Sequence, residues 1–213
     1  ERARDSGVSK VFMPNIDDTT VEAMLNVCTA YKGYCFPMIG FHPTSVGADS
    51  LFRIYEMKKL LSGEHPFVAV GEVGMDLYWD KTYLKEQQKA LDIQIQWALE
   101  YHLPLVLHCR EAFPELFEVM EPYKKTELSG IFHSFTGTLE EAGQVLEYAR
   151  FFFGINGVVT FKKSSLAEVL PHIPLGRIVL ETDSPYLAPV PFRGKRNESS
   201  YIKNVAMKLA EIY

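Results

Sequence analysis

The chain has 213 residues, of which 47% are hydrophobic and 23% are charged, and its formal net charge is −5 at pH 7. This length and apolar content are enough for one sizeable hydrophobic core. The acidic balance argues against broad electrostatic binding of nucleic acid, although it leaves room for a local basic site. No stretch approaches the roughly 18 consecutive apolar residues that a membrane span needs, so no membrane partner is expected.

The cysteines and the start of the chain bear on where the protein works. Cys28, Cys35 and Cys109 are too few to suggest a disulfide framework. Reduced thiols are typical of cytoplasmic proteins, and no charged-then-apolar leader is present, so we expect a cytoplasmic location. The chain opens without Met on a stretch that resembles the end of a helix. We therefore expect that an earlier piece is missing from this sequence.

Short apolar runs alternate with longer amphipathic stretches along the chain. Seven apolar runs predict strands, at 8–14, 34–43, 66–76, 103–110, 129–135, 151–159 and 177–183. Helical periodicity between the runs predicts helices over 85–101, 138–149 and 164–170. In the second of these helices, Thr138 is a predicted N-cap, and Glu141 completes a capping box three residues later.

Strands that alternate with helices indicate βαβ units and a parallel sheet. Near-continuous apolar runs agree with this, because parallel strands are covered on both faces. A doubly wound sheet and a barrel both satisfy the pattern. Polar residues end several different strands and no glycine-rich phosphate-binding motif follows any of them, which favours the barrel. We therefore predict an α/β fold, a (β/α)8 TIM-type barrel whose first strand is missing, with residues 1–213 forming a single domain.

Ionisable residues stand near the ends of several predicted strands, namely His42, Glu72, Asp76, His108, His133, Glu181 and Asp183. In a barrel, such residues converge on one mouth. Imidazole suits Zn and similar ions, while carboxylate also accepts Mg or Mn. Each residue alone has a structural explanation, such as a hydrogen-bonded imidazole or a carboxylate that caps a turn. Taken together they favour a hydrolytic metal site, since buried charges need partners.

Four longer motifs add a family resemblance, which covers the chain from about Val8 to its end. They are GEVGMD (71–76), LHCRE (107–111), FHSFTG (132–137) and LETDSPYLAPVPFRGKRNE (180–198), and GFHP (40–43) fits as well. Together they resemble the TatD family of metal-dependent hydrolases, which lies within the amidohydrolase-like (β/α)8 barrels. The resemblance implies a divalent metal cofactor, two ions of Mg, Mn or Zn, and a nucleic acid substrate, DNA ends.

The resemblance also assigns roles to individual residues. Glu72 matches the carboxylate that bridges two metals, and His108 and His133 match the imidazole ligands of one metal. Asp183 matches a ligand of the other metal and the acceptor of a proton from the attacking water. His42 matches a position that faces the substrate. The catalytic residues implied are therefore Asp183 and Glu72.

One family feature has no counterpart in this sequence. Many members begin with a strand that ends in an H-x-H pair, which completes the first metal site. Either a short piece is missing here, or the protein holds one metal more weakly. The abrupt start of the chain favours the missing piece.

The expected function is that of a deoxyribonuclease that cleaves phosphodiester bonds at DNA ends through metal-activated water. Arg193 and Arg196 follow the last strand and are expected to bind the substrate. Tyr78 and Trp79 either stack on a base or form a hydrophobic rim. An ester or amide hydrolase, such as an aminoacyl-tRNA deacylase on the same metal site, is the main alternative, and a non-catalytic barrel is a third. No obligate protein partner is inferred.

Overall fold

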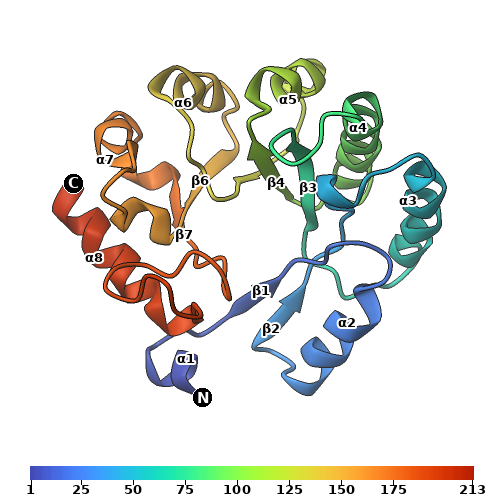
Figure 1. The fold of residues 1–213 in the computed structure, drawn as a ribbon. Helices are drawn as coiled ribbons and strands as arrows, with labels where there is room; N and C mark the ends of the chain where they lie inside the picture. The colour runs from blue at the N-terminus through green and yellow to red at the C-terminus, as the bar shows by residue number, and fades with distance from the viewer. The chain divides into compact units, whose positions relative to one another are not determined.

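The structure is a computed structural model that describes all residues from 1 to 213. Strands and helices alternate along most of the chain (Figure 1). The strands are β1 (Val11–Met13), β2 (Cys35–Pro37), β3 (Val70–Asp76), β4 (Leu105–Arg110), β5 (Gly130–Phe132), β6 (Phe151–Ile155) and β7 (Ile178–Leu180). The helices are α1 (Arg2–Asp5), α2 (Val21–Ala30), α3 (Ser50–Lys58), α4 (Leu84–Glu100), α5 (Phe113–Met120), α6 (Leu139–Leu146), α7 (Leu166–Val169) and α8 (Ile202–Ile212).

The chain divides into two compact units. One unit is Lys10–Ile131, and the other combines Glu1–Ser9 with Phe132–Tyr213. Each unit has fully buried side chains of its own, such as Trp97 in the first and Phe153 in the second. This division does not test the single domain expected from the sequence, which stays a prediction.

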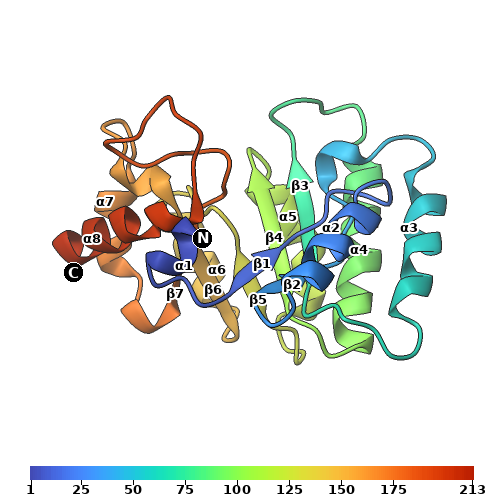
Figure 2. The same ribbon diagram turned by 90° about the horizontal axis from the view of Figure 1, so that it is seen from below.

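The Lys10–Ile131 unit contains two parallel strand pairs, β1 with β2 and β3 with β4. All seven residues of β3 are buried, as its near-continuous apolar sequence predicts. Helix α4 packs along β3, and α3 packs against α4 (Figures 1 and 2). This packing buries one face of α4, including Leu91 and Ile95.

In the second unit, β6 and β7 pair in parallel, so that Phe153 faces Ile178 across the ladder. Helix α8 packs against β7 and against the short 3-10 helix η4 (Gly157–Thr160). Helix α6 begins at Thr138 with the predicted capping box, because Thr138 accepts from the Glu141 N–H and Glu141 accepts from the Thr138 N–H. An ion pair of 2.6 Å joins Arg2 in α1 to Glu198.

All seven predicted strands are present, although each is shorter than its apolar run. The helix predicted over 164–170 is a single turn, because Pro171 follows and lacks the N–H that a longer helix needs. Four helices, α2, α3, α5 and α8, carried no individual prediction. None of the helices combines the length and the apolar character that crossing a membrane would require.

Candidate active site

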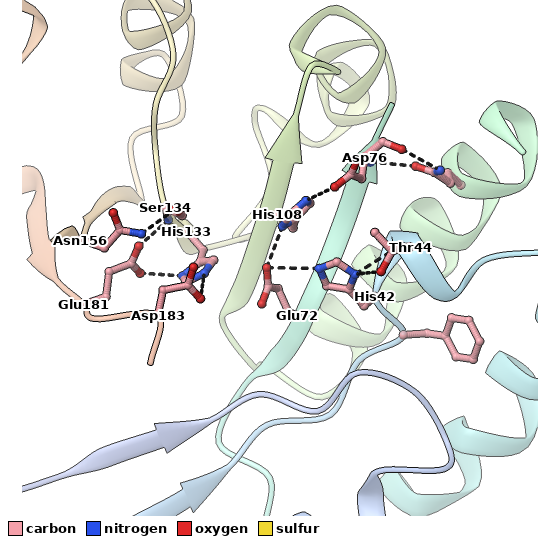
Figure 3. A network of polar contacts seen from close by, with 12 residues as sticks. His42, Thr44, Glu72, Asp76, His108, His133, Ser134, Asn156, Glu181 and Asp183 are labelled. Carbon is pink, nitrogen blue, oxygen red and sulfur yellow. Dashed lines mark hydrogen bonds and ion pairs between the residues drawn. The ribbon is translucent and has the colours of Figure 1, made fainter. Parts of the chain in front are cut away.

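Strands β3 and β4 bring three of the ionisable residues into direct contact. Nδ1 of His108 lies 2.9 Å from Oε1 of Glu72, and Nε2 of His108 lies 2.9 Å from Oδ2 of Asp76 (Figure 3). The side chains of Glu72 and Asp76 are only 9% and 2% exposed. We call His42, Glu72, Asp76 and His108 the His108 cluster.

His42 completes this cluster from the segment that follows β2. Its Nδ1 lies 2.7 Å from Oγ1 of Thr44, which turns its Nε2 toward Glu72 Oε1 at 3.5 Å. Ligand atoms of His42, Glu72 and His108 all lie within 4.8 Å of one another. Two imidazoles and a buried carboxylate at this spacing suit a divalent ion, which would partner the Glu72 charge. The substrate-facing role expected of His42 stays a prediction, and its position makes it a further candidate ligand.

The electrostatics of the cluster are dominated by His108. Burial lowers the pKa of His108, but hydrogen bonds to Asp76 and Glu72 and their charges outweigh burial and raise the pKa to about 9. Burial raises the pKa of Asp76, but the hydrogen bond and charge of His108, with the Tyr78 and Trp79 N–H groups, hold that pKa below its ordinary value. Without a metal, His108 is therefore protonated, and its imidazolium lies between the carboxylates of Glu72 and Asp76. A divalent cation would take the place of that proton.

This proton makes metal binding depend on pH. Since the pKa of His108 is about 9, the metal-free protein carries imidazolium at pH 7.5, and a metal needs the neutral ring. We expect binding to release about one proton at pH 7.5, and affinity to rise about tenfold per pH unit until it levels off near pH 9. Calorimetry in buffers of different ionisation enthalpy measures the proton release. Affinity that is independent of pH between 7 and 9 would contradict this assignment.

A second group of polar side chains lies in the other unit, around the end of β7. Nδ1 of His133 lies 2.7 Å from Oε2 of Glu181, and Nε2 of His133 lies 3.4 Å from Oδ1 of Asp183 (Figure 3). The other Glu181 oxygen accepts the backbone N–H of Ser134. We call His133, Ser134, Glu181 and Asp183 the Glu181 cluster. Its carboxylates and imidazole are also suitable metal ligands.

Asn197 holds the loop that carries Asp183. Its side chain is buried, and its Nδ2 donates to the carbonyl oxygens of Thr182 and Tyr186, each at 2.6 Å. The Asn197 backbone N–H donates to the carbonyl of Pro185 at 2.9 Å. Asp183 itself adopts a left-handed φ of 57°, a conformation that Asp tolerates better than most residues. The side chain of Asp183 is thus directed by a fixed loop.

Gly154 on β6 leaves the space that the Glu181 carboxylate occupies. A Cβ at this position would lie 2.4 Å from Glu181 Oε2. We expect Gly154→Ala to displace that carboxylate from His133 and to lower activity by about 10- to 100-fold, the usual cost of disturbing a residue that orients a metal ligand. Thermal stability should change little, because the displaced atoms end a flexible side chain. Gly143→Ala, which meets nothing within 4 Å, is the matched control. Equal activity of both variants would contradict the role of Glu181.

The structure brings the predicted ligands together in two pairs. Glu72 contacts His108, and His133 contacts Asp183, each pair within one unit. The ligand set of all four residues stays a prediction. Of the two predicted substrate-binding residues, Arg193 is exposed and lies over the Phe161 ring at 3.7 Å, and Arg196 is exposed.

The sequence assigned no role to four residues of these networks, namely Asp76, Ser134, Glu181 and Asn197. Asp76 lies four residues after Glu72 in GEVGMD, and Glu181 lies two residues before Asp183 in LETD, so both have a sequence signal as second carboxylates. Asn197 has no such signal, because its role depends on where its buried amide points.

The sequence is similar to a protein-family model and to several known proteins. Residues 1–213 match a family model described as TatD related DNase. The chain is 35% identical to a Bacillus subtilis protein named uncharacterized metal-dependent hydrolase YabD, over all of this chain and 82% of that protein. It is 32% identical to a Pantoea ananatis protein named 3'-5' ssDNA/RNA exonuclease TatD, over 98% of this chain and 82% of that protein.

Solved structures give the fold. The crystal structure of YJJV, a TatD homologue from Escherichia coli K12, matches with a TM-score of 0.87 at 27% identity, over 99% of this chain and 81% of that chain. An uncharacterized amidohydrolase from Saccharomyces cerevisiae matches in fold with a TM-score of 0.83 at 17% identity, over 99% of this chain and 85% of that one. These likenesses confirm the predicted α/β fold class, that of a partial TIM-type barrel.

Proposed function

Because the chain belongs to the TatD family of metal-dependent hydrolases, we propose that it is a nuclease that cleaves phosphodiester bonds at the ends of single-stranded DNA. The observation that carries the metal part of the proposal is the buried Glu72 carboxylate between the imidazoles of His42 and His108. The nucleic acid part is supported by the Pantoea relative, which is named for exonuclease action on single-stranded DNA and RNA.

We assign Glu72, His108, His133 and Asp183 as metal ligands, on the resemblance of their motifs, with His42 as a further donor. The chemistry of these donors suits Mg, Mn or Zn, one ion or two. A bound divalent ion supplies positive charge for a phosphoryl oxygen and lowers the pKa of water. The side chains of the protein accept the proton, position the ligands and bind the substrate.

Asp183 is the proton acceptor in this proposal. Its side chain is 30% exposed, so water can reach it, and Asn197 fixes the loop on which it stands. Glu181 holds Nδ1 of His133, and Asp76 holds Nε2 of His108. Such carboxylate–imidazole contacts fix ring orientation and raise the basicity of a histidine ligand. Asp76 and Glu181 therefore act as positioning residues.

Substrate binding falls to exposed basic residues on an acidic protein. Arg193 and Arg196 follow Asp183 in the loop before α8. Because 27 acidic residues outnumber 22 Lys and Arg residues, for a net charge of −5, the chain is suited to holding a strand at its end rather than along its length. We expect substrate affinity to fall as the salt concentration rises. The slope of log affinity against log salt concentration should be shallow, as for about one or two phosphate contacts. A cytoplasmic location remains part of the proposal, and none of the three cysteines forms a disulfide.

The test separates the phosphodiester from other esters. Single-stranded DNA carrying a label at the 5′ or the 3′ end is incubated with the protein and Mg, Mn or Zn, and aminoacyl-tRNA is tested in parallel. We expect stepwise shortening of one labelled strand, which also gives the polarity of cleavage. Deacylation of aminoacyl-tRNA without DNA cleavage would replace the nuclease with an ester hydrolase. If the folded, metal-loaded protein neither cleaves DNA nor deacylates aminoacyl-tRNA, a non-catalytic binding role would be favoured.

A further inference from the structure

An exposed group of aromatic and basic side chains lies beside the His108 cluster, on the same unit. Trp79 is 70% exposed and Tyr78 is 48% exposed, in the loop that follows β3. The exposed guanidinium of Arg110, the last residue of β4, lies 3.7 Å from the Tyr78 ring centre and 5.3 Å from that of Trp79. We call Tyr78, Trp79 and Arg110 the platform.

The platform is held in shape by several contacts. The rings of Tyr78 and Trp79 meet edge to face, with centroids 4.8 Å apart and an interplanar angle of 86°. Asp76 Oδ1 accepts the backbone N–H groups of both residues, at 3.0 and 3.4 Å. The Gln87 side chain fixes Asp76 in turn, since it accepts the Asp76 N–H at 2.8 Å and donates to the Asp76 carbonyl at 3.0 Å. A side chain as large as Trp79 is thus kept exposed by an ordered loop.

One carboxylate joins the platform to the His108 cluster. While Oδ1 of Asp76 holds the platform loop, Oδ2 of the same group lies 2.9 Å from Nε2 of His108. Arg110 also stands two residues after His108 on β4, and residues two apart share one face of a strand. A phosphate at the cluster would therefore have the platform as its neighbour within this unit.

We propose that the platform is a nucleobase subsite, in which a base of a single-stranded nucleic acid stacks on Trp79 while Arg110, held over Tyr78, binds the adjoining phosphate. The inference rests on the proposed function, and it adds the group that the site recognises. Arginine and aromatic side chains together are the usual means of holding unpaired bases, because every base presents a π-face. A duplex keeps its bases stacked on one another, so the platform selects for single strands.

The chemistry of the platform favours a base over an apolar partner. A hydrophobic rim would need no cation, yet Arg110 lies over Tyr78 with its N–H donors available to a phosphate. The ring of Trp79 contacts Tyr78 edge to face and has the Arg110 guanidinium 5.3 Å from its centre, and the residue is otherwise largely open. Base stacking on such a ring is worth about tenfold or more in affinity.

The test measures binding without cleavage. In Asp183→Asn protein with Mg²⁺, a short dye-labelled thymidine oligonucleotide is compared with an abasic oligonucleotide of equal length and charge. We expect Trp79→Ala to weaken binding of the thymidine strand about tenfold and that of the abasic strand less than twofold. Phe52→Ala, at an equally exposed aromatic residue (70%) on α3, is the matched control and should change neither.

Tryptophan fluorescence gives a second readout. The chain has two tryptophans, and Trp97 is only 1% exposed, so quenching by an added strand reports on Trp79. The thymidine strand should quench, and the abasic strand should not. Trp79→Phe should retain most of the affinity, and Trp79→Leu replaces the alanine variant if that variant fails to fold.

The two proposals fail in different ways. Equal losses for both strands in Trp79→Ala, or a loss no larger than that of Phe52→Ala, would overturn the nucleobase subsite, whether or not the wild-type protein cleaves DNA. Base-selective binding that depends on Trp79, in a protein that cleaves no DNA under any metal, would support the subsite and overturn the nuclease proposal.

Discussion

Replacing Asp183 with Asn is expected to lower turnover by about 10²- to 10⁴-fold, the range that follows from losing a positioned general base. Asn keeps the size of Asp but cannot accept the proton of the attacking water. The fold should remain intact, because Asn tolerates the left-handed φ of 57° at this position as well as Asp does. His133 also keeps its contact with Glu181 at 2.7 Å, so its imidazole is not left without a carboxylate partner.

Steady-state hydrolysis of single-stranded DNA measures this effect, with thermal unfolding and metal content measured beside it. Asp49→Asn is the matched control, since Asp49 precedes α3 and its side chain makes no capping hydrogen bond. A substantially unchanged turnover in Asp183→Asn would remove Asp183 from the chemistry. If the Asp183→Asn protein were unfolded, its loss of activity would report on a role of Asp183 in folding of the loop and not on proton transfer.

Gly74→Ala is expected to destabilise the protein strongly, because it would place a methyl group against the backbone of β4. Gly74 has a φ of 138°, and a Cβ there would lie 2.0 Å from the backbone oxygen of His108. Gly74 faces His108 directly in the β3–β4 ladder, so no side chain can move aside to relieve the clash. We expect a loss of about 4 kcal/mol in the free energy of unfolding and a fall in Tm of roughly 8–16 °C.

Thermal unfolding followed by circular dichroism measures this loss. Gly143→Ala on α6 is the control, because nothing lies within 4 Å of the added Cβ. That substitution should stabilise the helix by about 0.5–1 kcal/mol, since Ala is the better helix former. A Gly74→Ala protein with the Tm of the wild type would contradict the close approach of β3 to β4.

The strands were the most predictable part of the fold, for a physical reason. Parallel strands buried on both faces need near-continuous apolar residues, and β3 and β4 show this in 66–76 and 103–110. Strand ends were less predictable, because a ladder ends where its partner ends. The predicted strand over 34–43, for example, is reduced to Cys35–Pro37 and a single bridge from Ile39 to Val70.

The motifs predicted that ionisable residues would gather near strand ends, but they did not predict which atoms would contact one another. Glu72 and His108 were expected near strand ends, and the structure shows them in contact. Two further contacts depend on side-chain direction. Asp76 contacts the second nitrogen of His108, and Asn197 donates a hydrogen bond to the loop that carries Asp183. Sequence periodicity gives the face on which a residue lies, and it does not give the atom that a side chain reaches.

Metal-dependent hydrolysis in wild-type protein and in Glu72→Ala tests the role of the His108 cluster most directly. Both proteins are stripped with a chelator and then titrated with Mg, Mn or Zn, while shortening of an end-labelled single-stranded DNA is followed. Glu22→Ala, at an exposed residue of α2, is the control. We predict that metal restores the wild type and the control, and that Glu72→Ala stays at least about 100-fold slower, above the usual effect of a residue outside the ligand shell. Full restoration of Glu72→Ala at the same metal concentration, or undiminished activity of the stripped wild type, would contradict metal binding by Glu72 as the basis of the activity.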